Sequence, residues 1–134
     1  GEIPLEAALT QLPGMNFDVL FGDKSQTNAA DIFSSDRFGA FLDTLCERYD
    51  YIIIDTPPVL AVADARIIGR WVDTTVYTVQ WDKTSYRQVI EGLKSFDQVN
   101  VKVAGLVLSQ ISPRGMKRYG YADSYGSYQT YYDT

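Results

Sequence analysis

Blocks of apolar residues alternate along the chain with polar turns, and their spacing predicts helices and strands in turn. In the first third, the pattern predicts a short helix over residues 4–9, a strand over 17–21 and a helical turn over 28–33. Ser34 or Ser35 can then cap a helix over residues 36–48. The apolar stripe of this helix consists of Phe38, Phe41, Leu42, Leu45 and Cys46.

The rest of the chain continues this alternation with longer elements. Residues 51–55 form an apolar, mostly β-branched run that ends in an aspartate, which predicts a parallel strand covered on both faces. A helix over residues 61–71, a strand over 74–80, a helix over 86–98 capped by Thr84 or Ser85, and a strand over 101–109 follow. This order predicts right-handed crossovers and an α/β fold with a mainly parallel sheet.

Composition limits the chemistry that this chain can perform. The 134 residues suffice for one domain, and a formal net charge of −5 argues against a nucleic-acid partner. Histidine is absent from the sequence, which removes the Ser–His and Cys–His catalytic pairs. The lone cysteine, Cys46, is expected to be a small core residue. Any catalysis must therefore use carboxylates, hydroxyls, lysine, arginine or a hard cation.

The C-terminal segment is rich in tyrosine and poor in aliphatic side chains. We therefore expect residues 1–111 to form the folded body and residues 112–134 to form a flexible tail that closes no core. The tail exposes hydroxyl groups to chemistry. Its tyrosines are Tyr119, Tyr121, Tyr125, Tyr128, Tyr131 and Tyr132.

Asp55 is the strongest candidate for a functional residue. A carboxylate at the carboxyl end of a buried parallel strand lies where open α/β sheets bind their ligands. In P-loop enzymes, an aspartate after four apolar residues helps to hold Mg²⁺ beside the nucleotide phosphates. The alternative is an aspartate that caps a helix or closes a turn after the strand. Pro57 and Pro58, which follow directly, favour the metal role.

The phosphate loop that normally accompanies such an aspartate has no counterpart in the sequence. The pattern Gly-x-x-x-x-Gly-Lys-Ser/Thr does not occur. Residues 22–25 end in Lys-Ser, but Asp23 replaces the glycine before the lysine and would place an acid against the phosphates. We interpret this fragment as a surface turn.

Taken together, residues 12–109 resemble the C-terminal portion of the bacterial tyrosine kinases (BY-kinases) that accompany exopolysaccharide and capsule export. The resemblance is carried by residues 12–22, by residues 28–33, by a Walker B region over residues 49–60 with Asp64-Ala65 after it, and by the strand residues 105–108. The six tail tyrosines are similar to the family's autophosphorylated cluster. The Walker B region alone is shared with ATPases that position cell-division or plasmid machinery. The tyrosine-rich tail is therefore the feature that favours the kinases over these ATPases.

This resemblance implies a three-layer, P-loop NTPase-like α/β sandwich of the deviant Walker A type. It implies an ATP-dependent protein-tyrosine autokinase that regulates exopolysaccharide synthesis and export. By position, Asp55 would help to bind Mg²⁺, largely through water, and Asp64 would couple this loop to ATP. Ser109 and Gln110 stand where the family has an asparagine near the adenine. For Asp64, the alternative is the N-cap of the following helix.

The resemblance also implies partners and a location. The tail tyrosines would be phosphorylated in trans within a ring-like homo-oligomer. A polysaccharide co-polymerase or adaptor segment of the inner membrane and a tyrosine phosphatase would be further partners of this cytoplasmic domain.

The family's phosphate loop and Walker A′ strand would lie before Gly1. The chain alone is therefore expected to be inactive and to expose sheet edges that invite association. Two alternatives stay open: a partitioning-type ATPase with an unmodified tail, and a non-catalytic assembly module.

Overall fold

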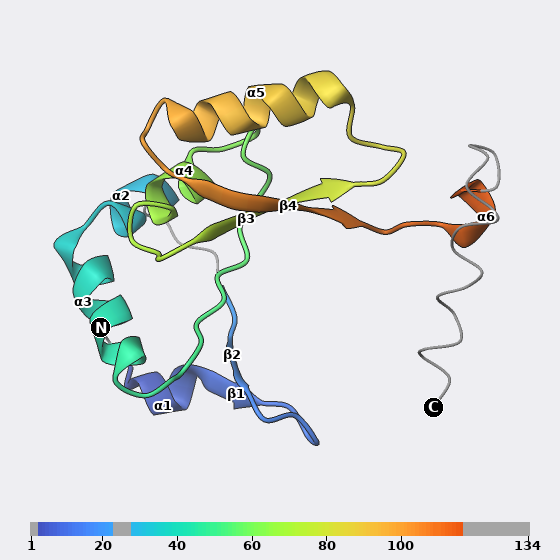
Figure 1. The fold of residues 1–134 in the computed structure, drawn as a ribbon. Helices are drawn as coiled ribbons and strands as arrows, with labels where there is room; N and C mark the ends of the chain where they lie inside the picture. Colours follow the sequence, from blue (N-terminus) through green and yellow to red (C-terminus); the bar gives the residue numbers. More distant parts are fainter. Residues whose placement is uncertain (1–2, 23–27, 117–134) are drawn as a thin grey trace.

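The computed structural model describes residues 3–22 and 28–116 (Figure 1). Within these residues the helices are α1 (Leu5–Ala8), α2 (Ala29–Phe33), α3 (Asp36–Cys46), α4 (Asp64–Ile68), α5 (Tyr86–Asp97) and α6 (Pro113–Met116). The strands are β1 (Leu9–Gln11), β2 (Asp18–Leu20), β3 (Thr75–Gln80) and β4 (Val103–Ser109). None of the helices in this part of the chain has the length and apolarity needed to cross a bilayer.

The strands of the described residues pair in two separate sheets. Strands β1 and β2 form an antiparallel hairpin in which Leu9 lies opposite Leu20. Strands β3 and β4 pair in parallel, with Gln80 opposite Ser109 at their carboxyl ends. The connection between these two strands contains α5, as the alternation of strand and helix in the sequence predicts.

Helix α5 covers one face of the β3–β4 pair (Figure 1). Its Gly92 permits this close packing, because a Cβ atom there would lie only 2.2 Å from the Tyr77 hydroxyl of β3. Phe96, only 3% exposed, packs with Val59, Ala65 and Val101 in the main hydrophobic cluster. This cluster joins the end of α5 to α4 and to the loop before α4.

A second apolar group joins α2, α3 and the residues after α4. The rings of Phe33 and Phe38 meet edge to face at 5.1 Å, and Phe38 meets Trp71 at 6.3 Å. The Trp71 Nε1 group also donates a hydrogen bond of 2.9 Å to the Phe33 carbonyl. Gly39 of α3 lies so close to the Trp71 ring that a Cβ atom would approach it to 2.5 Å. These contacts hold α2, α3 and the segment after α4 together.

The two longer helices begin where the sequence predicts. The Phe38 amide donates to Ser35 Oγ at 3.3 Å, so Ser35 is the N-cap of α3. Ser85 and Gln88 form a capping box at the start of α5, in which the Ser85 amide donates to Gln88 Oε1 at 2.9 Å. The predicted helix over residues 61–71 is shorter than expected, because only α4 is helical there.

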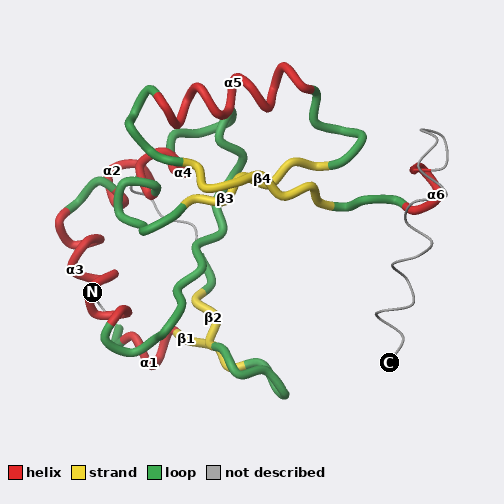
Figure 2. Tube along the Cα trace, in the orientation of Figure 1, coloured by secondary structure: helices red, strands yellow, loops and turns green. Residues whose placement is uncertain are grey.

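The predicted strand over residues 51–55 is wrong. Figure 2 shows the connection between α3 and α4 as loop, and these five residues have no strand partner among the described residues. Tyr51 and Ile53 are 89% and 93% exposed, whereas Ile52 and Ile54 are half-buried. The backbone lacks neighbours with which to form a ladder, so its β propensity is not realised. The described parallel sheet therefore has two strands, and the described residues do not form three layers.

The expected core position of Cys46 is also wrong. Leu42 and Leu45 of the same apolar stripe are buried, but the Cys46 thiol is exposed. Cys46 is the last residue of α3, where the helix and its buried stripe end.

Candidate functional site

Asp55 lies near the end of the extended segment that leads from α3 towards α4. Its side chain is exposed, and it makes no hydrogen bond or ion pair within residues 3–22 and 28–116. Pro57 and Pro58 follow, and the Ala61 amide closes a turn by donating to the Pro58 carbonyl at 2.9 Å. Val59, buried in the main cluster, anchors this turn. The Asp55 carboxylate is therefore attached to a fixed turn but has both oxygens available for a ligand.

The other end of this segment is attached to the N-terminal hairpin. The Tyr49 hydroxyl donates a hydrogen bond of 2.6 Å to the Asp18 carboxylate of β2, and this bond raises the pKa of Tyr49. Arg48 pairs with Glu6 of α1, which lowers the pKa of the Glu6 carboxyl. Two contacts thus connect α1 and β2 to the residues that begin the Asp55 segment.

Ser109 and Gln110 lie at the carboxyl ends of the parallel strands, where α/β sheets bind ligands. Ser109 Oγ donates to the Val79 carbonyl at 3.4 Å. Gln110 adopts a left-handed conformation with φ of 56°, and its Oε1 accepts a hydrogen bond of 2.6 Å from Gln80 Nε2. The structure therefore adds Gln80 to this edge. In the sequence, Gln80 could have been noticed as the polar residue that ends the strand predicted over residues 74–80.

Asp64 is the first residue of α4. Ala63 occupies the N-cap position, and no side chain caps this helix. Asp64 makes no hydrogen bond or ion pair in the described part of the chain. The N-cap alternative for Asp64 is therefore wrong, and its half-buried carboxylate has no structural partner there.

The structure brings some of the predicted residues together and leaves others apart. Gln80, Ser109 and Gln110 share one edge of the β3–β4 pair. No hydrogen bond joins Asp55 or Asp64 to that edge among the described residues. No cluster of three or more acidic or cysteine side chains in those same residues could hold a metal ion by itself. The six tail tyrosines and the fragment Asp23-Lys24-Ser25 lie outside the described residues.

One open depression of about 640 Å³ lies on the N-terminal hairpin. It is lined by residues 11–18 and by Tyr49, and Asp18 is already engaged by the Tyr49 hydroxyl. Neither Asp55 nor Gln110 lines this depression, so it is separate from the candidate functional residues.

Comparisons with known proteins identify the family. No family model matches the chain. It is 37% identical over 119 residues to the tyrosine-protein kinase wzc of Salmonella typhi, a match that covers 89% of this chain and 16% of that protein. It is 35% identical over 113 residues to the tyrosine-protein kinase ptk of Acinetobacter johnsonii, covering 83% of this chain and 15% of that protein.

A solved structure gives the same answer. The kinase domain of VpsO superposes with a TM-score of 0.77 at 28% identity, over 84% of this chain and 55% of that domain. The chain belongs to the bacterial tyrosine kinases. It spans about a sixth of the length of the curated family members that it matches. The α/β arrangement with a parallel β3–β4 pair is therefore that of part of a bacterial tyrosine-kinase domain.

Proposed function

We propose that this chain is the Walker B part of an ATP-dependent protein-tyrosine autokinase that regulates exopolysaccharide or capsule synthesis and export. The observation that carries the proposal is the match to the kinase domain of VpsO over 84% of the chain, with a TM-score of 0.77. The tyrosine-rich C-terminal sequence supports the same function, because it supplies phosphate acceptors on the same polypeptide. The finer fold that follows from this proposal is a three-layer sandwich completed by the Walker A and Walker A′ strands.

Asp55 is the residue that would hold Mg²⁺. Magnesium prefers oxygen ligands and keeps several of its waters, so one exposed carboxylate without a protein partner suits a contact through water. When bound, ATP would supply the phosphoryl group, and Mg²⁺ would neutralise the charge that develops on the phosphates. Asp55 orients the hydrated cation, and Asp64 on the following helix couples the loop to the nucleotide. A cation at Asp55 needs further ligands from ATP and from other parts of the kinase.

The edge formed by Gln80, Ser109 and Gln110 would face the nucleotide base. Glutamine side chains can donate and accept hydrogen bonds at once, which suits the edge of an adenine. Gln80 already orients the Gln110 amide through the bond of 2.6 Å. The left-handed backbone at Gln110 is a conformation that non-glycine residues adopt at a cost, and such residues are common at binding sites.

The acceptors in this proposal are Tyr119, Tyr121, Tyr125, Tyr128, Tyr131 and Tyr132, phosphorylated in trans in a ring-like homo-oligomer. Residues 1–111 would be the kinase body and residues 112–134 the acceptor tail, although the start of this tail is not the flexible segment expected, because Pro113–Met116 form α6. The partners would be a membrane adaptor of the polysaccharide export machinery and a tyrosine phosphatase. The domain would act at the cytoplasmic side of the inner membrane.

Mass spectrometry of the full-length protein that contains this chain, incubated with Mg²⁺ and ATP, tests the function. We expect phosphate on the tail, and none when all six tail tyrosines are changed to phenylalanine. The matched control changes Tyr51 and Tyr86 to phenylalanine, since they are 89% and 82% exposed on the described body. Labelling that survives in the sixfold variant contradicts the proposed acceptors. ATP hydrolysis without any phosphotyrosine favours a partitioning-type ATPase.

A further inference from the structure

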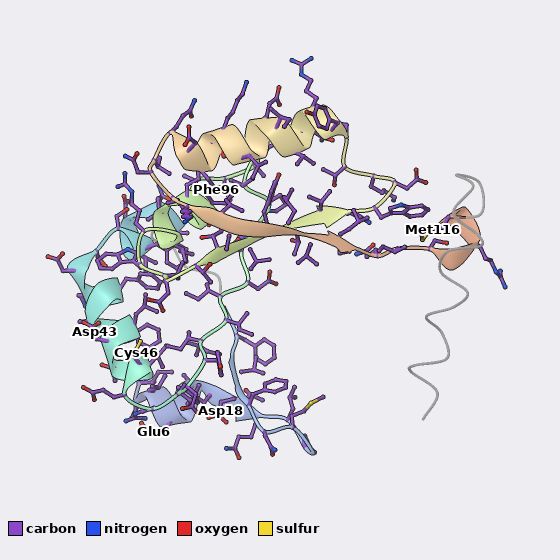
Figure 3. The ribbon with its side chains drawn as sticks, viewed as in Figure 1. Glu6, Asp18, Asp43, Cys46, Phe96 and Met116 are labelled. Atoms are coloured by element: carbon purple, nitrogen blue, oxygen red, sulfur yellow. The ribbon has the colours of Figure 1, made fainter. Side chains whose placement is uncertain are left out.

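Helix α6, which immediately precedes residues 117–134, packs against the indole ring of Trp81. A Cβ atom at Gly115 would lie 2.3 and 2.7 Å from two atoms of that ring, so only glycine permits this approach. Trp81 follows β3 directly, and α6 lies beyond the carboxyl ends of β3 and β4 (Figure 1). Figure 3 labels Met116 at this end of the molecule. The last described residues are therefore in contact with the sheet body.

Further hydrogen bonds support this contact. The Trp81 amide donates to the Ser109 carbonyl at 2.9 Å, which fixes the backbone of Trp81 to the end of β4. At the start of α6, the Gly115 amide donates to Ser112 Oγ at 3.2 Å and the Met116 amide donates to the Ser112 carbonyl at 2.9 Å. Gly115 and Met116 are half-buried. The segment from Ser109 to Met116 thus carries α6 to the indole ring of Trp81.

This contact sets the point from which the tyrosine-rich segment continues. A fully extended chain spans at most about 3.5 Å per residue. Tyr119 follows Met116 by three residues, so its Cα atom can lie at most about 10 Å from that of Met116. Tyr132 follows by sixteen residues and can lie as far as about 55 Å away. A fixed point at Met116 therefore restricts the first tyrosines far more than the last.

Without the contact, the fixed point would move back to Gln110, which Gln80 holds. The six additional residues add about 20 Å of reach to every tyrosine. The maximal reach of Tyr119 increases about threefold, from about 10 to about 30 Å, whereas that of Tyr132 increases only from about 55 to about 75 Å. Release of α6 thus changes which tyrosines can enter a given site.

We propose that the Trp81–Gly115 contact is an anchor that selects the acceptor tyrosines by limiting how far each of them can reach. This inference rests on the proposed kinase function, and it assigns Trp81 and Gly115 as positioning residues. With the anchor formed, phosphorylation favours Tyr131 and Tyr132 over Tyr119 and Tyr121. In each transfer, the phenol oxygen bonds to the γ-phosphorus of ATP and the bond to the β,γ-bridging oxygen breaks. ADP leaves and the phenol proton passes to solvent.

The experiment measures phosphate at each tyrosine of the full-length protein by mass spectrometry. Trp81→Ala removes the ring, and Gly115→Val places side-chain atoms against it. In both variants, the ratio of phosphate on Tyr119 and Tyr121 to phosphate on Tyr131 and Tyr132 should rise about threefold or more. If the contact were merely structural, its loss would lower the amount of phosphate at all six tyrosines together and leave this ratio unchanged. Arg114→Gln, an exposed change within α6, is the matched control and should keep the parent ratio.

A third variant keeps the anchor and lengthens the chain after it. Six Gly and Ser residues inserted between Met116 and Lys117 should raise the same ratio, even if Trp81→Ala reduces stability. Tryptic cleavage after Arg114 should accelerate in Trp81→Ala, because the following peptide group is no longer packed on the indole. Phosphotyrosine with an unchanged ratio in all of these variants overturns the anchor alone. Absence of phosphotyrosine from every protein, the parent included, overturns the proposed function and the anchor with it.

Discussion

The Tyr49 hydroxyl and the Asp18 carboxylate are joined by a hydrogen bond of 2.6 Å across 31 positions of sequence. This bond connects β2 to the start of the segment that carries Asp55. A carboxylate that accepts a hydrogen bond from the neutral phenol disfavours ionisation of that phenol, so the pKa of Tyr49 is raised above its ordinary value. The bond is therefore a long-range tie whose strength depends on pH.

Removing this bond should destabilise the body in a pH-dependent way. A raised pKa in the folded state means that the contribution of Tyr49 is complete below the ordinary phenol pKa of about 10. That contribution disappears as the pH rises through the higher pKa of the folded state. Thermal unfolding of Tyr49→Phe should thus occur below that of the parent at neutral pH, and the gap should close in alkali. Tyr51→Phe, which removes an exposed hydroxyl, should show no gap at any pH.

Asp55→Asn should reduce autophosphorylation of the full-length protein about 10- to 100-fold, the effect expected for a group that holds a metal through its waters. Raising the Mg²⁺ concentration should restore part of the activity. The fold should be unaffected, since Asp55 is exposed and has no partner in the described residues. Asp50→Asn, at the other end of the same segment, is the matched control. Equal rates for the two variants would remove Asp55 from the metal site.

Gly92→Ala should destabilise the contact between α5 and β3 by about 1–3 kcal/mol through overpacking. The added Cβ atom would lie 2.2 Å from the Tyr77 hydroxyl and 2.8 Å from the ring carbon that bears it. Tyr77→Phe should therefore rescue part of the loss, but not all of it. A double-mutant cycle by urea unfolding measures the coupling between the two positions. Additive changes would show that the helix moves away from the strand instead.

Ser85→Ala should cost about 1 kcal/mol, because it removes the cap of α5 and one half of the capping box. Ser95→Ala is the matched control. Its hydroxyl donates to the Gly92 carbonyl inside the same helix, where alanine is a better helix former. The free energies of unfolding of the two variants, measured with urea, should distinguish the effect of removing the cap from the effect of removing any serine hydroxyl of the helix. Equal destabilisation would contradict the capping role.

Local signals in the sequence were sufficient wherever the structure depends on local contacts. Ser35 and Ser85, each one of two residues predicted for its cap, are the N-caps of α3 and α5, since a cap requires only residues within one turn. The segment with Tyr51 and Ile53 shows the limit of such reasoning. Its β-branched residues favour a strand, but a strand also requires a neighbour across the ladder, which the described residues do not provide.

Of the candidate site, the sequence predicted one location. The strand predicted over residues 101–109 and the observed β4 both end at Ser109, whereas the contact of Ser109 and Gln110 with the nucleotide base comes from the resemblance and stays a prediction. Gln80 ends the strand predicted over residues 74–80, but its bond to Gln110 could not be predicted, because that bond depends on the pairing and register of β3 with β4. The Tyr49–Asp18 bond was also missed, since nothing in either local sequence indicates the other.

The exposed end of α3 offers a site for attaching a fluorescent label. Cys46 is the single cysteine of the sequence, and its thiol is accessible, so one maleimide dye can be attached without any substitution. Figure 3 shows Cys46 and Met116 at opposite ends of the view. A label on this thiol leaves the Trp81–Gly115 contact untouched. It therefore permits fluorescence studies of this chain without any substitution.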